Sequence, residues 1–154
     1  MTIRKATPDE ANLLNELFYR SKAHWGYDEA FMERVRHLIY IIPKQIAQSW
    51  VYVHEDEAAR VVGFYMLLRG DDETTFHLEY LFIEPQDIGR GYGKALFQHA
   101  VALVRTLGGT AVTLAADAHA EAFYLKLGCI RIGDQESVLP YRTLPLLRYS
   151  LPAD

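Results

Sequence analysis

The stretch from Glu79 to Ala100 joins an extended apolar segment to a helical segment through a glycine-rich turn, and it constrains the fold most strongly. Tyr80 to Ile83 are apolar without a break, and Pro85 then removes a backbone donor, so we predict a buried strand that ends there. From Leu96 to Leu107 the apolar residues recur at helical spacing, which predicts a helix. The rest of the chain is interpreted as support for this strand, turn and helix.

Three glycines within five residues, Gly89, Gly91 and Gly93, separate the strand from the helix. Glycine backbones can turn their amides inward and a helix N-terminus is electropositive, so the turn is typical of an anion site. A P-loop would need Ser or Thr where Ala95 stands, and a dinucleotide-binding turn from Gly89 would need a small residue where Lys94 stands. The alternative is a flexible connection between the strand and the helix. Three glycines in five residues make the chain harder to order, and a simple connection would not need that cost.

Length and composition predict one domain over residues 1–154, with half of the residues apolar and 12% aromatic. The net charge of −4, with Lys and Arg scattered, gives no basic face for nucleic acid and mildly favours a cationic substrate. The longest apolar run, Val61 to Leu68, is too short to span a bilayer, and the N-terminus does not resemble a signal peptide. Cys129 is the single cysteine, which excludes an internal disulfide and fits a cytoplasmic location.

Capping and breaking residues predict the remaining elements. A helix should begin at Thr7 to Glu10 and end near Lys22, Asp28 should cap a second helix, and Pro43 should open a short helical turn. The predicted order is one strand, two helices, three antiparallel strands, a helix, a strand, a helix and two strands, which indicates an α+β fold. The other expected elements are strands Thr2 to Ala6, Trp50 to Val53, Val61 to Leu68, Thr74 to Ile83, Ala111 to Ala115, Cys129 to Ile132 and Leu144 to Tyr149, and a short helix Ala118 to Leu127.

Two segments resemble motifs of the GCN5-related N-acetyltransferases. The run from Ile83 to Gly93 resembles the pyrophosphate-binding motif, in which Gln or Arg, two residues, Gly, one residue, and Gly or Ala follow a strand; Ile88 departs from it. The run from Asp117 to Gly128 resembles the later Asn-x-x-Ala-x-x-Phe-Tyr-x-x-x-Gly motif, with Asp117 in place of Asn. The order of elements matches the family over nearly the whole chain. The resemblance implies the acyl-CoA N-acyltransferase fold, a central mixed, mostly antiparallel sheet flanked by helices.

The same resemblance implies that acetyl-CoA is the co-substrate. Backbone amides around Leu81 to Ile83 are expected to bind the pantetheine and to polarise the thioester carbonyl. Arg90 and Lys94 are expected to screen phosphate charge, although an exposed lysine at a helix start is often only solvated. The residues expected to bind the co-substrate are Leu81, Phe82, Ile83, Ile88, Gly89, Arg90, Gly91, Tyr92, Gly93, Lys94, Asp117 and Phe123.

Glu79 and Tyr124 are the two residues to which the resemblance assigns chemistry. Leu78 to Ile83 is similar to the Leu-Glu-x-Leu-x-Val segment of polyamine acetyltransferases, where the Glu is the general base, because an ammonium must lose a proton before it attacks. Tyr124 is expected to protonate the departing thiolate. Glu79 as a strand-end rim residue, and Phe123 and Tyr124 as aromatic packing, are the structural alternatives.

The acceptor is the least determined part of the prediction. Trp25 and Tyr27 flank a glycine between two predicted helices, where they would form a platform for an alkyl ammonium or pack the helices together. We expect a small primary amine as acceptor; a protein or peptide amine, or a binding module without turnover, are the alternatives. The histidines show no metal-ligand spacing, so no metal is expected. We expect a homodimer, with the apolar segment Tyr141 to Leu147 either pairing with a second subunit or finishing the sheet.

Overall fold

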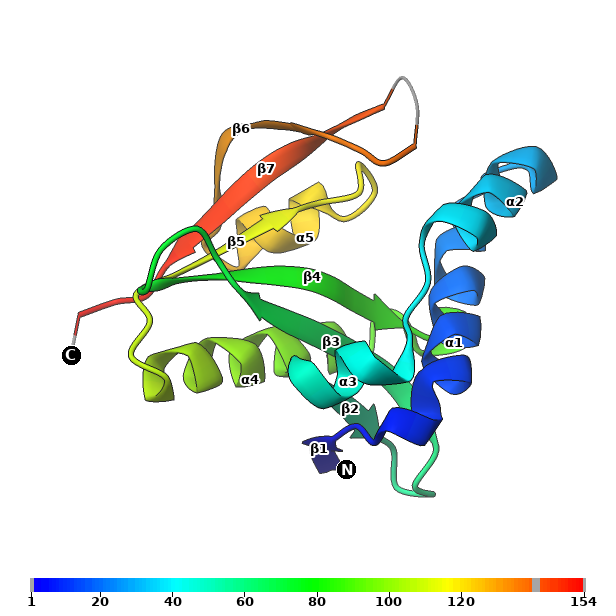
Figure 1. Ribbon diagram of the computed structural model, residues 1–154, viewed down its shortest axis with the longest axis horizontal. Helices are drawn as coiled ribbons and strands as arrows, with labels where there is room; N and C mark the ends of the chain where they lie inside the picture. The colour runs from blue at the N-terminus through cyan, green and yellow to red at the C-terminus, as the bar shows by residue number, and fades with distance from the viewer. Residues whose placement is uncertain (1, 140–141, 154) are drawn as a thin grey trace. The chain divides into compact units, whose positions relative to one another are not determined.

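The computed structural model describes residues 2–139 and 142–153, which form seven strands, five α-helices and two short 3-10 helices (Figure 1). The strands are β1 (Thr2–Lys5), β2 (Trp50–Glu55), β3 (Val61–Arg69), β4 (Thr75–Ile83), β5 (Ala111–Ala115), β6 (Ile130–Glu136) and β7 (Thr143–Ser150). The helices are η1 (Pro8–Glu10), α1 (Ala11–Ala23), α2 (Glu29–Leu38), α3 (Pro43–Gln48), η2 (Pro85–Asp87), α4 (Tyr92–Thr106) and α5 (Glu121–Lys126).

The strands are hydrogen bonded in the order β1-β2-β3-β4-β5-β7-β6. β4 and β5 run parallel, whereas β1 with β2, β5 with β7, and β6 with β7 run antiparallel, so the sheet is mixed. The predicted α+β class is confirmed. The chain divides into two compact units, which are described separately: the first is Met1–Met66 with Tyr80–Phe97, and the second is Leu67–Glu79 with Gln98–Asp154.

Local capping begins the helices of the first unit as the sequence predicts. The backbone N–H of Thr7 donates to the Glu10 carboxylate at 2.9 Å, and the Phe31 N–H donates to the Asp28 carboxylate at 2.8 Å. Glu10 also forms an ion pair with Arg4 of β1 at 2.9 Å, which connects the strand to the start of the helical segment. These contacts satisfy backbone donors that helix starts leave open.

The core of the first unit is the apolar face of α1 packed on the strands. Leu14 and Leu17 are fully buried, and the Phe18 ring meets the Phe82 ring at 4.6 Å and the Tyr80 ring at 5.5 Å in edge-on geometry. Edge-to-face aromatic pairs add roughly 1 kcal/mol to simple area burial. This packing fixes the last residues of β4, from which the glycine turn starts.

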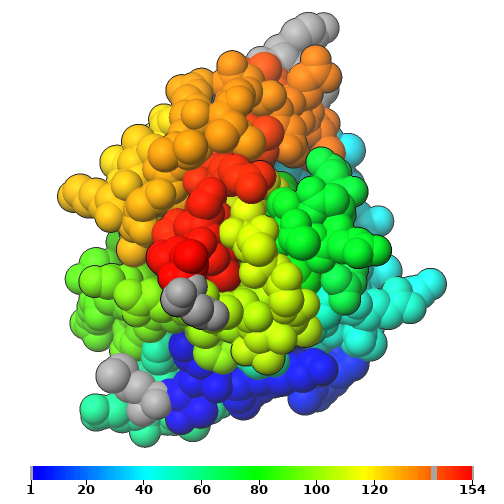
Figure 2. Space-filling model, turned by 90° about the vertical axis from the view of Figure 1, so that its left-hand side faces the viewer, coloured from blue at the N-terminus to red at the C-terminus, as the bar shows by residue number. Residues whose placement is uncertain are grey.

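In the second unit β5 is paired on both sides. His77 of β4 is in register with Thr113 of β5, and Ala111 of β5 is in register with Ser150 of β7. Figure 2 shows the end of β7, in red, beside the yellow-green start of β5. β7 lies between β5 and β6, so the residues from Leu144 to Leu147 pair within this sheet, and β6 forms its edge. Tyr141 lies outside the described residues.

Three predicted boundaries are wrong. α4 begins at Tyr92, four residues before its apolar repeat, because Tyr92 to Ala95 are half-buried or exposed and show no apolar periodicity. The helix predicted from Ala118 to Leu127 is shorter, since the Asp117 carboxylate accepts the His119 N–H at 3.1 Å and keeps the following residues in a turn. The strand predicted from Cys129 to Ile132 is longer, because β6 runs from Ile130 to Glu136, and every residue of it is exposed.

Candidate functional site

The predicted glycine turn lies in the first unit, between η2 and α4. Gly89 and Gly91 have φ angles of +87° and +88°, in the left-handed region that residues with a Cβ rarely adopt. A Cβ built at either glycine meets nothing within 4 Å. The handedness of the backbone, and not a lack of space, therefore requires glycine at these two positions. Gly93, the third glycine, lies inside α4.

The turn leads into the N-terminus of α4. The Ala95 N–H donates to the Gly91 carbonyl at 3.1 Å, so the amides of Tyr92, Gly93 and Lys94 precede the regular helical hydrogen bonds. Aligned peptide dipoles give this end partial positive charge, and Lys94 is exposed beside it. Together with the open space at the glycines, this end of the helix fits a phosphate or pyrophosphate group.

A buried carboxylate organises the start of the turn. Only 2% of the Asp87 side chain is exposed, and its two oxygens lie 2.9 Å from Arg60 Nη2 and 3.5 Å from Arg90 Nη1. Arg90 itself is largely exposed and keeps further N–H donors for an anion. The sequence analysis found Arg90 but missed Asp87 and Arg60, because Arg60 is on the distant β2–β3 hairpin and no local pattern connects the two.

Ile88 and Tyr92 have different surroundings. The Ile88 side chain is exposed, and its backbone N–H donates to Pro85 in a long hydrogen bond of 3.4 Å. The Tyr92 ring meets the ring of the buried His54 on β2 edge-on, with centroids 4.8 Å apart. Tyr92 therefore attaches the first turn of α4 to the sheet of the first unit.

The last residues of β4 are less enclosed than predicted. Leu81, Phe82 and Ile83 are half-buried, whereas the sequence predicts a fully buried run. Phe82 packs on α1, and the Glu84 N–H donates to the Val62 carbonyl at 2.8 Å. The end of β4 beside the turn is therefore not fully enclosed.

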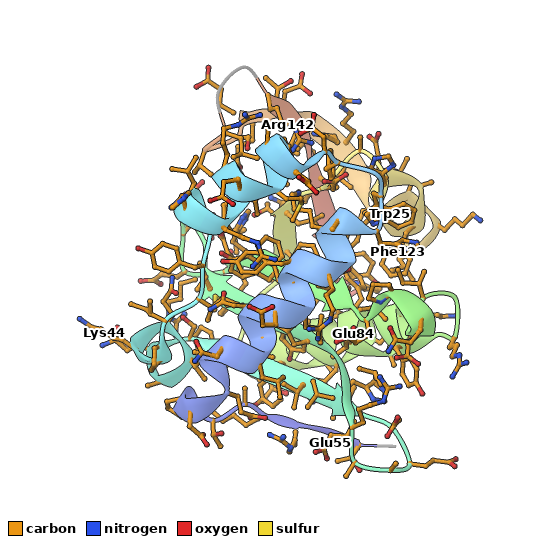
Figure 3. All side chains as sticks on the ribbon, turned by 90° about the vertical axis from the view of Figure 1, so that its right-hand side faces the viewer. Trp25, Lys44, Glu55, Glu84, Phe123 and Arg142 are labelled. Atoms are coloured by element: carbon orange, nitrogen blue, oxygen red, sulfur yellow. The ribbon has the colours of Figure 1, made fainter. Side chains whose placement is uncertain are left out.

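Glu84 follows β4 and is held by helix α1 (Figure 3). Its side chain is 8% exposed and forms a two-point ion pair with the Arg20 guanidinium, with Nε to Oε2 at 3.2 Å. A hollow of about 380 Å³ lies beside this pair. It is lined by Leu13, Arg20, Arg60, Val61, Glu84 and Gln86.

The two aromatic residues predicted for the acceptor differ from each other. Trp25 is 41% exposed at the end of α1 (Figure 3), and its ring meets His24 edge-on. Tyr27 stacks on Phe31 with centroids 4.3 Å apart, and Lys22 Nζ lies 5.2 Å from the Tyr27 ring. An internal ammonium therefore already occupies a cation–π position at Tyr27. Trp25 is the more exposed of the two rings.

Glu79, in the second unit, lies near a histidine that the sequence analysis did not select. The Glu79 side chain is 42% exposed, and Oε2 lies 3.6 Å from Nε2 of His77. The other ring nitrogen of His77, Nδ1, lies 3.0 Å from the Thr113 hydroxyl on β5. Residues two apart on a strand project to the same face, so this spacing was a usable sequence signal for His77.

Tyr124 is a buried residue of α5. Burial raises the pKa of its phenol well above the ordinary value, so the phenol keeps its proton at neutral pH. The Phe123 ring meets the Tyr124 ring edge-on at 5.0 Å. Burial also raises the pKa of the Cys129 thiol to about 11, so a thiolate nucleophile is disfavoured there.

Asp117 acts on its own turn. Its Oδ1 accepts the His119 N–H, and its Oδ2 lies 3.9 Å from the Arg142 guanidinium. The Asp117 carbonyl accepts the Ala120 N–H at 2.9 Å, which leads the chain into α5. The carboxylate is therefore used locally to shape the segment before Tyr124.

Each unit brings together part of the predicted set. The first unit contains the glycine turn, the end of β4 and the two acceptor aromatics; the second contains Glu79, Asp117, Phe123 and Tyr124. Across residues 2–139 and 142–153, no group of three or more His, Cys, Asp or Glu side chains is arranged to hold a metal ion. No helix in this part of the chain is both long and apolar enough to cross a membrane.

Comparison with known proteins identifies a family for this chain. A family profile described as "Acetyltransferase (GNAT) family" matches residues 11–129. The chain is 30% identical over 155 residues to the peptidyl-lysine N-acetyltransferase YjaB of Salmonella typhimurium, with 99% of each chain covered.

Two solved structures have a similar fold at low sequence identity. One is the PaiA N-acetyltransferase of Thermoplasma acidophilum in complex with coenzyme A, with a TM-score of 0.80, 17% identity, and 97% of this chain and 98% of that chain covered. The other is an aminoglycoside 6′-N-acetyltransferase complexed with coenzyme A, with a TM-score of 0.74, 17% identity, and 100% and 99% covered.

Proposed function

Because the chain belongs to the acetyltransferase (GNAT) family and is an N-acetyltransferase, we propose that it moves an acetyl group from acetyl-CoA to a primary alkyl amine. The observation that carries the co-substrate assignment is the pair of left-handed glycines, Gly89 and Gly91, with open space around them at the start of α4. We propose that residues 1–154 act as a single acetyltransferase domain. A cytoplasmic location belongs to the same proposal and is compatible with the single cysteine, Cys129.

The proposed co-substrate site uses backbone more than side chains. The amides at the start of α4 and the exposed charges of Arg90 and Lys94 would hold the pyrophosphate. The backbone of β4 would hold the pantetheine and orient the thioester, the bond that supplies the activated acetyl group. The proposed residues are Leu81, Phe82, Ile83, Ile88, Gly89, Arg90, Gly91, Tyr92, Gly93, Lys94, Asp117 and Phe123.

Glu79 is proposed as the base. At neutral pH an alkyl amine carries a proton, and its nitrogen has no lone pair until that proton leaves. The half-exposed Glu79 carboxylate can take the proton, and the amine nitrogen then attacks the thioester carbonyl carbon in a ternary complex. A carbon–nitrogen bond forms and the carbon–sulfur bond breaks.

Tyr124 is proposed as the acid that protonates the departing sulfur. A phenol is protonated at neutral pH, so a proton is available on the enzyme when negative charge develops on sulfur. The nitrogen loses its second proton as the amide forms, and this proton returns Tyr124 to the phenol through water. Glu79 then releases the first proton to solvent. The buried Cys129 thiol, with its pKa raised to about 11, makes direct transfer the preferred route over an acyl-cysteine.

We propose a small primary amine as acceptor, with Trp25 and Tyr27 on the acceptor side. The net charge of −4 favours a cationic acceptor. The exposed ring of Trp25 offers a cation–π surface, and Tyr27 supports it through its stack with Phe31. A lysine side chain of a protein is the second candidate, favoured by the 30% identity to a peptidyl-lysine acetyltransferase over the whole chain.

The acceptor proposal is tested by measuring thiol release from acetyl-CoA with polyamines, aminoglycosides, amino-acid derivatives and lysine-containing peptides. We expect kcat/KM for a small amine to exceed that of every peptide by at least about tenfold. Peptides used at far higher kcat/KM than any small amine would establish the lysine alternative. A Trp25→Ala variant should raise the KM of the preferred amine and leave the KM of acetyl-CoA unchanged.

A homodimer is also proposed. Since β7 is paired on both sides, we propose that the second subunit pairs with β6, one of the two edge strands of the sheet together with β1. Sedimentation at high micromolar concentration should give the mass of a dimer; a monomer mass would refute the proposal.

A further inference from the structure

Three polar side chains of the second unit form a row on one face of the sheet. Thr113 on β5 and His77 on β4 are in register, and their hydroxyl and Nδ1 atoms lie 3.0 Å apart. Glu79, two residues further along β4, projects to the same face, and its Oε2 lies 3.6 Å from His77 Nε2. The row therefore runs from hydroxyl to imidazole to carboxylate.

From this row we infer that His77 and Thr113 are positioning residues for Glu79. The inference rests on the proposed role of Glu79 as the base. We assign the Thr113 hydroxyl as the donor to Nδ1, which places the ring proton on Nε2, facing the Glu79 carboxylate. This N–H orients one carboxylate oxygen and leaves the other to take the proton of the amine.

The surroundings of His77 favour this role over simple packing. The His77 side chain is 22% exposed, so its ring is largely enclosed while the neighbouring Glu79 is accessible to a substrate. The 3.6 Å separation is longer than a hydrogen bond, as is common for catalytic pairs before the substrate is bound. Proton balance is kept, because the amine proton moves to Glu79 and His77 retains its own.

Other charged groups lie further along the same sheet. Arg148 of β7 is in register with Thr113, on the side away from His77. Arg69 of β3 lies over the ring of Phe76, which precedes His77 and projects to the opposite face. Glu79 is thus the charged side chain with a direct contact to the imidazole in the described structure of this unit.

Steady-state kinetics tests the role with variants of His77. His77→Leu should lower kcat about tenfold, the expected loss of a hydrogen bond to a charged group, and leave the KM of the amine within about twofold. His77→Gln, which places an amide N–H at similar reach, should restore most of kcat. A fall in both variants of equal size, or unchanged kcat in His77→Leu, overturns the inference.

A double-mutant cycle shows whether His77 acts through Glu79. In the Glu79→Gln background, His77→Leu should lower kcat by less than about twofold further, because the group that it positions is already lost. Multiplicative losses would mean that His77 acts independently, and the inference fails while the base assignment stands. An unchanged kcat in Glu79→Gln alone overturns both.

A readout that needs no turnover completes the test. In ¹⁵N NMR spectra, the His77 ring nitrogens are assigned by their loss in His77→Gln. Thr113→Val should change the ¹⁵N chemical shift of Nδ1, and Thr113→Ser should leave it unchanged. Glu79→Gln should change the ¹⁵N chemical shift of Nε2. If Nε2 does not respond to Glu79→Gln, the positioning contact is absent and the inference is overturned, whatever acceptor the enzyme uses.

Discussion

Glu79 in the second unit and Glu84 in the first follow each other closely in sequence but meet opposite conditions. Glu84 is nearly sealed, and both of its oxygens are engaged by Arg20. Glu79 is 42% exposed and has only a loose contact, with His77. Glu84 is shielded from a substrate and has a cation at both oxygens, which disfavours its protonation, whereas the accessible and loosely held Glu79 carboxylate can take a proton. The comparison separates a carboxylate that stabilises the fold from one suited to chemistry.

The largest expected effect is on Glu79. Glu79→Gln should lower kcat by about 10²–10⁴, the usual contribution of proton transfer, with little change in melting temperature because the side chain is exposed. Steady-state kinetics and thermal unfolding measure the two quantities. Glu73→Gln, on the turn before β4, is a matched control with unchanged kcat. A loss of less than about threefold in Glu79→Gln would remove the base assignment.

Tyr124→Phe should have the next largest effect. Removal of the phenol proton should lower kcat by about 10²-fold, while acetyl-CoA affinity measured by calorimetry stays the same. Leu125→Ala is the control, because Leu125 lies on the same helix with its side chain exposed and has no proposed role at the site. An equal fall of kcat in both variants would indicate that α5 supports the site by packing alone.

Substitution of Arg20 tests how much its ion pair with the buried Glu84 stabilises the fold. Arg20→Met leaves the buried Glu84 carboxylate without its partner, and we expect a loss of about 2 kcal/mol in the free energy of unfolding. Glu84→Gln leaves a half-exposed arginine that water can solvate, so its loss should be nearer 1 kcal/mol. Denaturant unfolding measures both. The reverse order would show that Glu84 is not as enclosed as its 8% exposure indicates.

Glu10 is an intermediate case with the smallest effect. Its pKa is lowered from 4.5 to about 2, chiefly by the hydrogen bond from Arg4. A lowered pKa in the folded state stabilises the protein above the unfolded value, so this contribution is complete above pH 4.5 and is lost as the pH falls toward 2. Glu10→Gln should therefore cost about 1 kcal/mol at pH 7 and nothing near pH 2. A pH-independent difference in unfolding free energy would contradict this.

Local signals predicted the elements well where one residue decides a boundary. Asp28 caps α2, Pro43 opens α3, and Pro85 ends β4, because each acts through its own backbone or a neighbour's. The sequence predicted a strand from Cys129 to Ile132, but periodicity cannot tell an edge strand from a central one. The exposure of β6 depends on the order of the strands in the sheet, and no local sequence pattern reveals that order.

The candidate site was predicted in part for the same reason. The glycine turn, Glu79 and Tyr124 stand in short motifs and were found. Arg60 and Asp87 were missed because an ion pair between a hairpin and a distant turn leaves no spacing in the sequence. His77 carried a usable signal, its position two residues before Glu79, but only the register with Thr113 gives that signal its meaning.

The left-handed backbone at Gly89 and Gly91 also decides which substitutions these two positions can accept during evolution. Space is open at both positions, yet alanine, the smallest step away from glycine, carries a left-handed penalty of about 1–2 kcal/mol. Asparagine and aspartate adopt that conformation more readily, but aspartate would set a negative charge against the phosphate that the loop is proposed to hold. Among descendants of this sequence, asparagine is therefore the replacement expected to survive at these two positions, ahead of residues that are smaller and chemically simpler.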